Sequence, residues 1–353
     1  MKNRYFNPSK RHHRPDGFQN NYQSFRGKRW NELLRWRWQA WRAGHPRPLS
    51  APIPVVLADL GFIHANAVAG LDMQPAMTWI GHITVLAQMG GLNILTDPVF
   101  SDRCFPVQWA GPKRQTPPGL RLDQLPHIDV VLLSHNHYDH MDEASLLALS
   151  KQAGGGPLFI TPLGHQHWFA RRGMHSVVEL DWWDTHVLEA TARSARIPVT
   201  LTPAQHWSAR TATDALRSLW GGFAVLSPDC HLFFAGDTAY SKDFVDIHHH
   251  FAREQTPALG GGFDMALLPI GAYEPRWFMK DQHVNPSESV QIFKDIGCKR
   301  ALAVHWGTFQ LTDEALDEPP RALATALHAQ GLSDGVFSVL PIGGTWHIAK
   351  RHP

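Results

Sequence analysis

Three histidines and one aspartate fall within six consecutive positions of this chain. The segment reads Ser134-His-Asn-His-Tyr-Asp-His140 and follows directly after the apolar run Val130–Leu133. Alternate residues of an extended chain point to the same side, so His135 and His137 can reach one ion. Asp139 and His140 lie on the following turn and can reach a second ion beside it. Imidazole and carboxylate ligands without thiolates suit Zn²⁺, with Mn²⁺ or Fe as alternatives.

Three further polar residues stand where apolar, strand-like runs end. They are His206 after the run 200–202, Asp237 after the run 232–234 and His305 after the run 301–304. A single histidine at a strand end is more typical of a packed core than of a metal site. Four strand ends in one chain, each carrying a metal-ligating side chain, indicate one shared site for two ions.

From residue 76 onward, short apolar runs alternate with segments of helical periodicity. Strands are expected at residues 77–80, 83–88, 93–96, 129–133, 158–160, 199–201, 222–226, 232–234, 265–268, 301–304, 336–340 and 345–348. Helices are expected at residues 143–151, 164–172, 242–253, 287–296 and 320–329. Paired antiparallel strands with intervening helices favour an α/β sandwich.

The positive charge of the chain is concentrated near its N-terminus. Residues 1–50 contain 12 Lys and Arg against 2 Asp and Glu, a net charge of +10, whereas the whole chain has a net charge of +2. The remaining residues are therefore acidic, with a net charge of −8. A basic arm on an acidic body favours an anionic partner, either a membrane surface or a polyanion. We divide the chain into a basic, Trp-rich arm at residues 1–50 and a body at residues 51–353.

Residues 30–42 of the arm have the pattern of a short amphipathic helix. Trp30, Leu33, Leu34, Trp38 and Trp41 share one face at helical spacing. Such a face can lie in a lipid interface, so a membrane surface is one expected partner. The alternative is that the same face packs onto the body. The Pro-rich stretch that follows the helix is expected to act as a linker.

Cysteine usage and the N-terminal composition bear on the cellular compartment. The three cysteines, Cys104, Cys230 and Cys298, are far apart and odd in number, so free thiols are expected. The N-terminus lacks the apolar segment of a secretory signal, and no apolar run reaches the length of a membrane span. These features favour a cytoplasmic protein that is soluble or attached peripherally to a membrane.

The ordered set of seven candidate ligands resembles the metallo-β-lactamase superfamily, in the branch that binds two metals. Longer segments narrow the resemblance to the N-acyl-phosphatidylethanolamine-hydrolysing phospholipase D family. Among them are residues 79–85, 95–98, 111–114, 134–142, 179–183, 205–207, 234–238, 269–280, 282–284 and 303–309. The resemblance covers residues 76–345 and implies a four-layer αββα sandwich, the metallo-β-lactamase fold.

The same resemblance implies a role for each residue. One zinc ion would be held by His135, His137 and His206, the other by Asp139, His140 and His305, and Asp237 would bridge both. Asp139, Asp237 and His283 are implied in catalysis, and Gln282, His283 and Tyr138 in contacts with the substrate. One departure from the family pattern is Ser208-Ala209, where a basic side chain is expected.

The implied reaction is hydrolysis of phosphatidylethanolamine, with or without an N-acyl group, to phosphatidic acid and the corresponding ethanolamine. A hydroxide that bridges the two zinc ions would attack phosphorus. Family resemblance also implies a homodimer, and the acidic body makes nucleic acid an unfavourable partner. Two alternatives stay open: a lactonase or phosphodiesterase acting on a soluble phosphorylated metabolite, and a membrane-binding protein with an inactive hydrolase domain.

Four other features have competing interpretations. His82 fits a structural histidine or one that orients a ligand, and Asp97 fits a turn cap or a carboxylate that orients a ligand histidine. The run His248–His250 is expected on an exposed helix surface, because consecutive helical residues do not converge on one face. The pair Trp182-Trp183 is expected to pack in the core.

Overall fold

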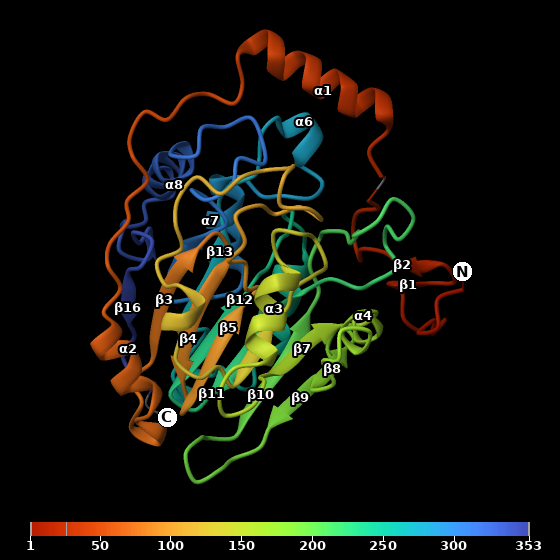
Figure 1. Cartoon of the computed structure of the whole chain (residues 1–353). Helices are drawn as coiled ribbons and strands as arrows, with labels where there is room; N and C mark the ends of the chain where they lie inside the picture. The colour runs from red at the N-terminus through yellow and green to blue at the C-terminus, as the bar shows by residue number, and fades with distance from the viewer. Residues whose placement is uncertain (1, 26, 352–353) are drawn as a thin grey trace.

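Two seven-stranded sheets stack face to face in the computed structural model, which describes residues 2–25 and 27–351 (Figure 1). The first sheet has the order β16 (Thr345–His347), β3 (Ala76–Gly81), β4 (Thr84–Met89), β5 (Leu92–Thr96), β6 (Val130–Leu132), β7 (Leu158–Pro162) and β8 (Val177–Leu180). The second has the order β15 (Phe337–Ser338), β14 (Ala301–Val304), β13 (Met265–Pro269), β12 (Cys230–Phe234), β11 (Gly222–Ser227), β10 (Ile197–Thr202) and β9 (Thr185–Leu188).

Helices cover the outer face of each sheet. On the first sheet these are α2 (Leu60–Ala67), α3 (Glu143–Ser150) and α4 (Gln166–Ala170). On the second they are α5 (Asp243–His250), α7 (Pro286–Asp295) and α8 (Glu318–Ala329). The expected four-layer αββα sandwich is therefore confirmed.

Strand β6 shows how the sequence builds these layers. Val130 and Leu132 belong to the large core that the two sheets share, whereas Val131 and Leu133 belong to the smaller core beneath the helices of the first sheet. Successive side chains of a strand point to opposite faces, so a strand buried on both faces is a continuous apolar run. The run ends at Ser134, where the metal-ligating segment begins.

The two sheets each combine antiparallel and parallel pairs. Strands β5 to β8 are parallel to one another, and so are strands β12 to β15. The remaining neighbours pair antiparallel, including β16 with β3. Since parallel strands end at the same edge of a sheet, the loops after β5 and β6 face the loops after β12 and β14 across the top of the sandwich.

Most expected elements are present, with a few differences. Strands β1 (His13–Arg14), β2 (Gly17–Phe18), β8 and β9 and helices α2 and α6 (Arg276–Met279) were not predicted. The helix expected at 164–172 is shorter because Gly164 and Gly173, with φ of 99° and 74°, have left-handed backbones that do not continue a helix. The strand expected at 336–340 pairs only over β15, which is the edge of its sheet and is followed closely by Pro341.

The N-terminal arm lies along the body before it leaves the surface. Its hairpin of β1 (His13–Arg14) and β2 (Gly17–Phe18) places Phe18 fully buried in the main core. Helix α1 (Trp30–Ala43) follows and lies apart from the sheets, above α6 (Figure 1). It ends at Gly44, whose left-handed backbone (φ 67°) terminates the helix.

Helix α1 contacts the body through a residue that its expected apolar face did not include. Trp36 packs against Phe278 of α6, with ring centroids 4.8 Å apart. Trp30, Trp38 and Trp41 remain 79%, 54% and 78% exposed. The expected face therefore points mostly to solvent rather than onto the body.

Several simpler expectations are also settled by the fold. The three cysteines are free and buried. His248–His250 lie on the exposed side of α5. Trp182 is buried, and its neighbour Trp183 packs against the core. Among the described helices, none has both the length and the apolar character that a membrane span requires.

Candidate metal centre

Every candidate ligand lies in a loop at one edge of the sandwich. The motif 134–140 follows β6, His206 follows β10, Asp237 follows β12 and His305 follows β14. The loop before Asp237 needs a close approach of two backbones. A Cβ at Gly236 would lie 2.6 Å from the Cβ of Ser134, so only glycine fits there.

Three imidazoles converge in the first ligand group, which consists of His135, His137 and His206. The Nε2 of His135 lies 2.8 Å from the Nδ1 of His137, and the Nε2 of His206 lies 3.3 Å from the same atom. Ring nitrogens this close cannot all carry a proton, so some of them direct lone pairs at one another. A cation bound between the three rings would explain this arrangement. This is the set that the sequence predicts for the first ion.

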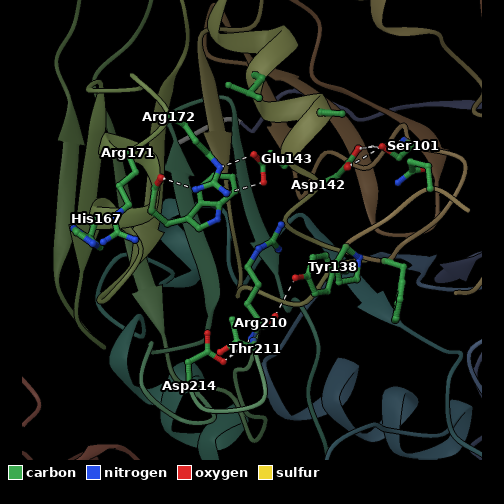
Figure 2. A pocket seen from close by; sticks show the side chains of 16 residues that line it. Ser101, Tyr138, Asp142, Glu143, His167, Arg171, Arg172, Arg210, Thr211 and Asp214 are labelled. Carbon is green, nitrogen blue, oxygen red and sulfur yellow. Dashed lines mark hydrogen bonds and ion pairs between the residues drawn. The ribbon is translucent and has the colours of Figure 1, made fainter. Parts of the chain in front are cut away.

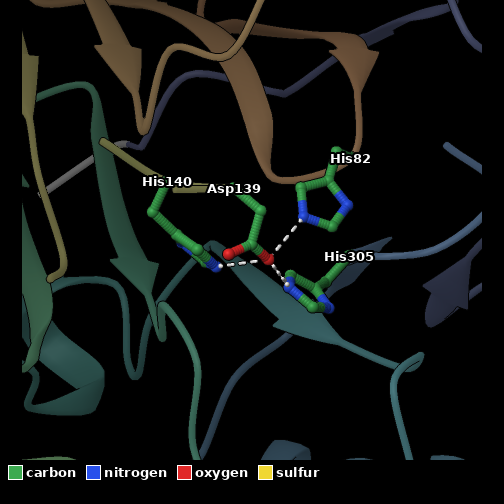
Figure 3. A group of neighbouring side chains, drawn as sticks. All are labelled: His82, Asp139, His140 and His305. Atoms are coloured by element: carbon green, nitrogen blue, oxygen red, sulfur yellow. Dashed lines mark hydrogen bonds and ion pairs between the residues drawn. The ribbon is translucent and has the colours of Figure 1, made fainter. Parts of the chain in front are cut away.

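The second group contains Asp139, His140 and His305, again the predicted set, together with His82 (Figure 3). One carboxylate oxygen, Oδ2 of Asp139, lies 3.4 Å from Nε2 of His140 and 3.3 Å from Nε2 of His305. Nε2 of His82 lies 3.1 Å from the same oxygen. His82 enters from the turn between β3 and β4.

Asp237 lies between the two groups. Its Oδ2 is 3.1 Å from Nε2 of His140 and 3.8 Å from Nε2 of His206, and its Oδ1 is 3.2 Å from Nε2 of His305. The side chain is 1% exposed. A carboxylate that touches ligands of both groups has the position that a bridging ligand requires.

Other residues hold the ligand rings in place. Asp97 accepts from Nδ1 of His140 at 2.7 Å and from the backbone N–H of Ser134 at 2.7 Å. His206 donates from Nδ1 to the carbonyl of Gln282 at 2.8 Å. Each such bond leaves the Nε2 lone pair of the histidine free to bind a metal, and its partner fixes the direction of the ring. Asp97 therefore has the position of a carboxylate that orients a ligand.

Burial keeps the first group neutral. It lowers the pKa of His137 to about 3 and that of His206 to about 4, and it lowers the pKa of His135 well below its usual value. A neutral imidazole is the form that binds a metal.

The carboxylates carry the negative charge of the site. Burial raises the pKa of Asp237, but the neighbouring His140 and His305 outweigh it and hold this pKa well below its usual value. Burial lowers the pKa of His140, but the carboxylates of Asp237 and Asp139 outweigh it and hold this pKa well above its usual value. The centre thus favours positive charge beside two carboxylates, of which Asp237 is buried and Asp139 is 15% exposed. Neutral imidazoles and ionised carboxylates in this arrangement fit divalent metal ions.

Backbone conformation is unusual at two facing residues. His82 and His305 both have left-handed backbones, with φ of 51° and 61°. The N–H of His305 donates to the carbonyl of His82 at 2.8 Å. A residue other than glycine in the left-handed backbone region costs of order 1–3 kcal/mol. Such strained residues are concentrated at functional sites.

We expect His82→Ala to weaken metal binding at the second group. Nε2 of His82 is in hydrogen-bond range of Asp139, so its removal frees a carboxylate that it orients. Loss of such a partner costs about 10–100-fold in metal affinity, which titration of the metal-free protein would measure. His127→Ala, an exposed histidine, is the control, and unchanged affinity in His82→Ala would refute the role.

The predicted catalytic and substrate residues lie in different surroundings. His283 has Nδ1 3.8 Å from Oδ2 of Asp237, at the edge of both groups. Gln282 is buried, with its side-chain amide against Sδ of Met279 and its carbonyl on His206. Tyr138 donates to the carbonyl of Arg210 at 3.0 Å.

Tyr138 also lines a cavity of about 640 Å³ beside the metal centre (Figure 2). The seven candidate ligands are not among the residues that line it, but three arginines are: Arg171, Arg172 and Arg210. The guanidinium of Arg210 lies 4.1 Å from the ring centre of Tyr138 and donates to the carbonyls of Asn136 and Met141. Three carboxylates, Asp142, Glu143 and Asp214, line the cavity as well, and Arg172 is paired with Glu143. Arg210 is the arginine that contacts the backbone of the metal-ligating motif.

A family model described as the beta-lactamase superfamily domain matches residues 92–306, a range that holds all seven candidate ligands. The chain belongs to the metallo-β-lactamase superfamily. It is a metal-dependent hydrolase of that superfamily.

Two relatives carry the same name. N-acyl-phosphatidylethanolamine-hydrolyzing phospholipase D 1 of Caenorhabditis elegans is 36% identical over 281 residues, which cover 78% of this chain and 76% of the relative. The Saccharomyces cerevisiae protein of that name is 39% identical over 262 residues, which cover 74% of this chain and 53% of the relative. This chain therefore spans about half the length of the yeast protein.

Two solved structures share the fold. An isothiocyanate hydrolase from Delia radicum gut bacteria matches with a TM-score of 0.60 and 19% identity, over 78% of this chain and 99% of that one. Igni18, a metallo hydrolase from Ignicoccus hospitalis, matches with a TM-score of 0.56 and 18% identity, over 77% of this chain and 97% of that one.

Proposed function

We propose that this metallo-β-lactamase superfamily member is a phosphodiesterase of the phospholipase D type. Its substrate would be phosphatidylethanolamine, with or without an N-acyl group, and its products phosphatidic acid and the corresponding ethanolamine. The observation that carries the proposal is the pair of ligand groups joined by Asp237. Two relatives named for this reaction, each more than 30% identical, support the substrate class.

The side chains have defined tasks in such a reaction. Two zinc ions, when held by the two ligand groups, would supply an activated water and neutralise the phosphate oxygens. Asp237 and Asp139 would fix the positions of both ions. As water adds to phosphorus, the bond from phosphorus to the ethanolamine oxygen breaks, and this oxygen needs a proton. His283 has a free Nδ1 near Asp237 and would stabilise the departing oxygen.

Helix α1 supports a lipid substrate because it displays an apolar stripe to solvent. Trp30, Leu34, Trp38 and Trp41 are all exposed and follow one another at helical spacing on one side. Exposed arginines on the same helix flank them: Arg35, Arg37 and Arg42. Trp side chains with flanking cations suit the interface of an anionic membrane. We propose that α1 holds the protein at such a surface.

The test is release of phosphatidate. Metal-loaded protein is incubated with vesicles that contain N-acyl-phosphatidylethanolamine or phosphatidylethanolamine, and lipid products are measured by mass spectrometry. Phosphatidate together with the matching ethanolamine is expected. Hydrolysis of a soluble chromogenic phosphodiester or of a lactone, without any phosphatidate, would replace the lipid assignment with the soluble-substrate alternative.

A further inference from the structure

The N-terminal arm reaches the metal centre at one buried asparagine. Asn20 follows β2 and is 6% exposed. Its Nδ2 donates to the carbonyl of His206 at 2.9 Å, and its Oδ1 accepts from the N–H of His206 at 3.1 Å. One side-chain amide therefore pairs with both backbone groups of a predicted ligand, as a neighbouring strand would.

The orientation of this amide is determined by a third partner. Nε1 of Trp220, which can only donate, lies 3.0 Å from Oδ1 of Asn20 and 2.9 Å from the carbonyl of Ala204. The amide oxygen therefore faces the two N–H groups, and the amide nitrogen faces the carbonyl of His206. Among the described residues, no other group pairs with the backbone N–H or carbonyl of His206.

Neighbouring residues add further contacts between the arm and the segment that carries His206. Nε2 of Gln205 donates to the carbonyl of Gln23 at 3.1 Å. Phe25 stacks on Trp207 with centroids 5.0 Å apart and planes at 12°. Trp207 in turn meets the ring of His137 edge-on at 4.5 Å. The arm thus touches the segment that carries His206, and Trp207 of that segment contacts a second ligand of the first group, His137.

The arm also contacts the body through residues that precede Asn20. Both buried histidines of the arm, His12 and His13, contact the carboxylate of Asp181, with Nε2 to oxygen distances of 2.6 and 2.8 Å. Lys10 lies 2.6 Å from the same carboxylate. Because these contacts fix the part of the arm that precedes Asn20, its amide needs little further ordering to reach His206. The entropy cost of ordering the arm is part of the folding of the chain and not of metal binding.

We infer that Asn20 is a positioning residue of the metal centre. It fixes the main chain of His206, so that its ring keeps Nε2 directed toward His135 and His137. Arm docking and metal binding at the first group are then coupled, and each strengthens the other by the same factor. The inference rests on metal binding by the site and not on the lipid substrate, so failure of the phospholipase assay leaves it intact.

The test is metal titration of the full chain after removal of metals. Asn20→Ala is compared with Asn21→Ala, whose neighbouring amide donates to Asp243 of α5 at 2.7 Å and not to the ligand segment. Calorimetry with Zn²⁺ and visible absorption with Co²⁺ report affinity and coordination. We expect Asn20→Ala to bind the first-group ion about 10–100-fold more weakly, whereas Asn21→Ala stays near wild type. Wild-type affinity in Asn20→Ala would overturn the inference.

A second measurement does not depend on folding of the variant. Metal-free and metal-loaded wild-type protein are exposed to trypsin, and cleavage after Arg4 and Arg11, which are exposed in the arm, is followed by mass spectrometry. Coupling predicts that metal loading slows cleavage at these sites relative to an exposed site distant from the arm, Arg121. An equal rate at the arm sites with and without metal would contradict it.

Discussion

Asp237→Asn is expected to lower kcat/KM by about three orders of magnitude, or ~4 kcal/mol of transition-state stabilisation. The carboxylate of Asp237 lies within 4.0 Å of histidines from both ligand groups. The amide has nearly the same shape but carries no charge. It therefore cannot bridge two cations, and the buried positive charge beside it loses its partner.

Metal content and kinetics together test this expectation. The purified variant should contain well below two ions per chain by elemental analysis, and excess Zn²⁺ should restore little activity. Asp123→Asn is the matched control, because Asp123 is exposed and pairs only with Arg121 on the surface. If Asp237→Asn retained two ions and wild-type kcat/KM, the assignment of Asp237 as a bridge would be wrong.

Replacing Trp30, Trp38 and Trp41 together with alanine is expected to weaken vesicle binding by about a thousandfold. Each exposed indole contributes about 1–2 kcal/mol when it enters an apolar interface, so three contribute ~4 kcal/mol. Sedimentation with vesicles of phosphatidylserine and phosphatidylcholine would measure the change. Turnover of a soluble phosphodiester should stay unchanged, since none of the three side chains belongs to the metal centre.

The control for the tryptophan variant removes exposed apolar side chains elsewhere on the surface. Leu57, Val68 and Leu71 are 100%, 70% and 57% exposed outside α1, and their joint replacement with alanine should leave vesicle binding unchanged. Substitution is preferable to deletion of the arm, because deletion would also remove Asn20 from the metal centre. Equal vesicle binding by the tryptophan variant and the wild type would show that α1 is not the membrane contact.

The arrangement of the predicted ligands follows from a simple property of the sequence. Each ligand comes directly after an apolar run, and parallel strands end at a common edge, so placing the strands also places the ligands. The alternating burial of Val130 to Leu133 shows why β6 was recognisable: both faces of the strand are covered. The different periods of strands and helices also indicated an α/β sandwich, whereas its four αββα layers were predicted from the family resemblance.

Other parts of the site depend on contacts that no local pattern contains. His82 comes from a hairpin turn, and only the packing of β3 and β4 beside β5 brings it to Asp139. Asn20 lies 186 residues before His206, in a polar segment with no periodicity. Trp36 was missed for a related reason: the packing face of α1 is set by α6, which is only four residues long.

The pairing of β16 with β3 has a consequence for synthesis of the chain on the ribosome. Thr78 and Thr345 share a hydrogen bond although 267 residues separate them. Until β16 has been synthesised, one edge of β3 is unpaired although all its residues are buried in the folded protein, and such edges template aggregation. Expression at low temperature or with chaperones that bind extended apolar segments should therefore raise the soluble yield, and truncation before residue 345 should lower it.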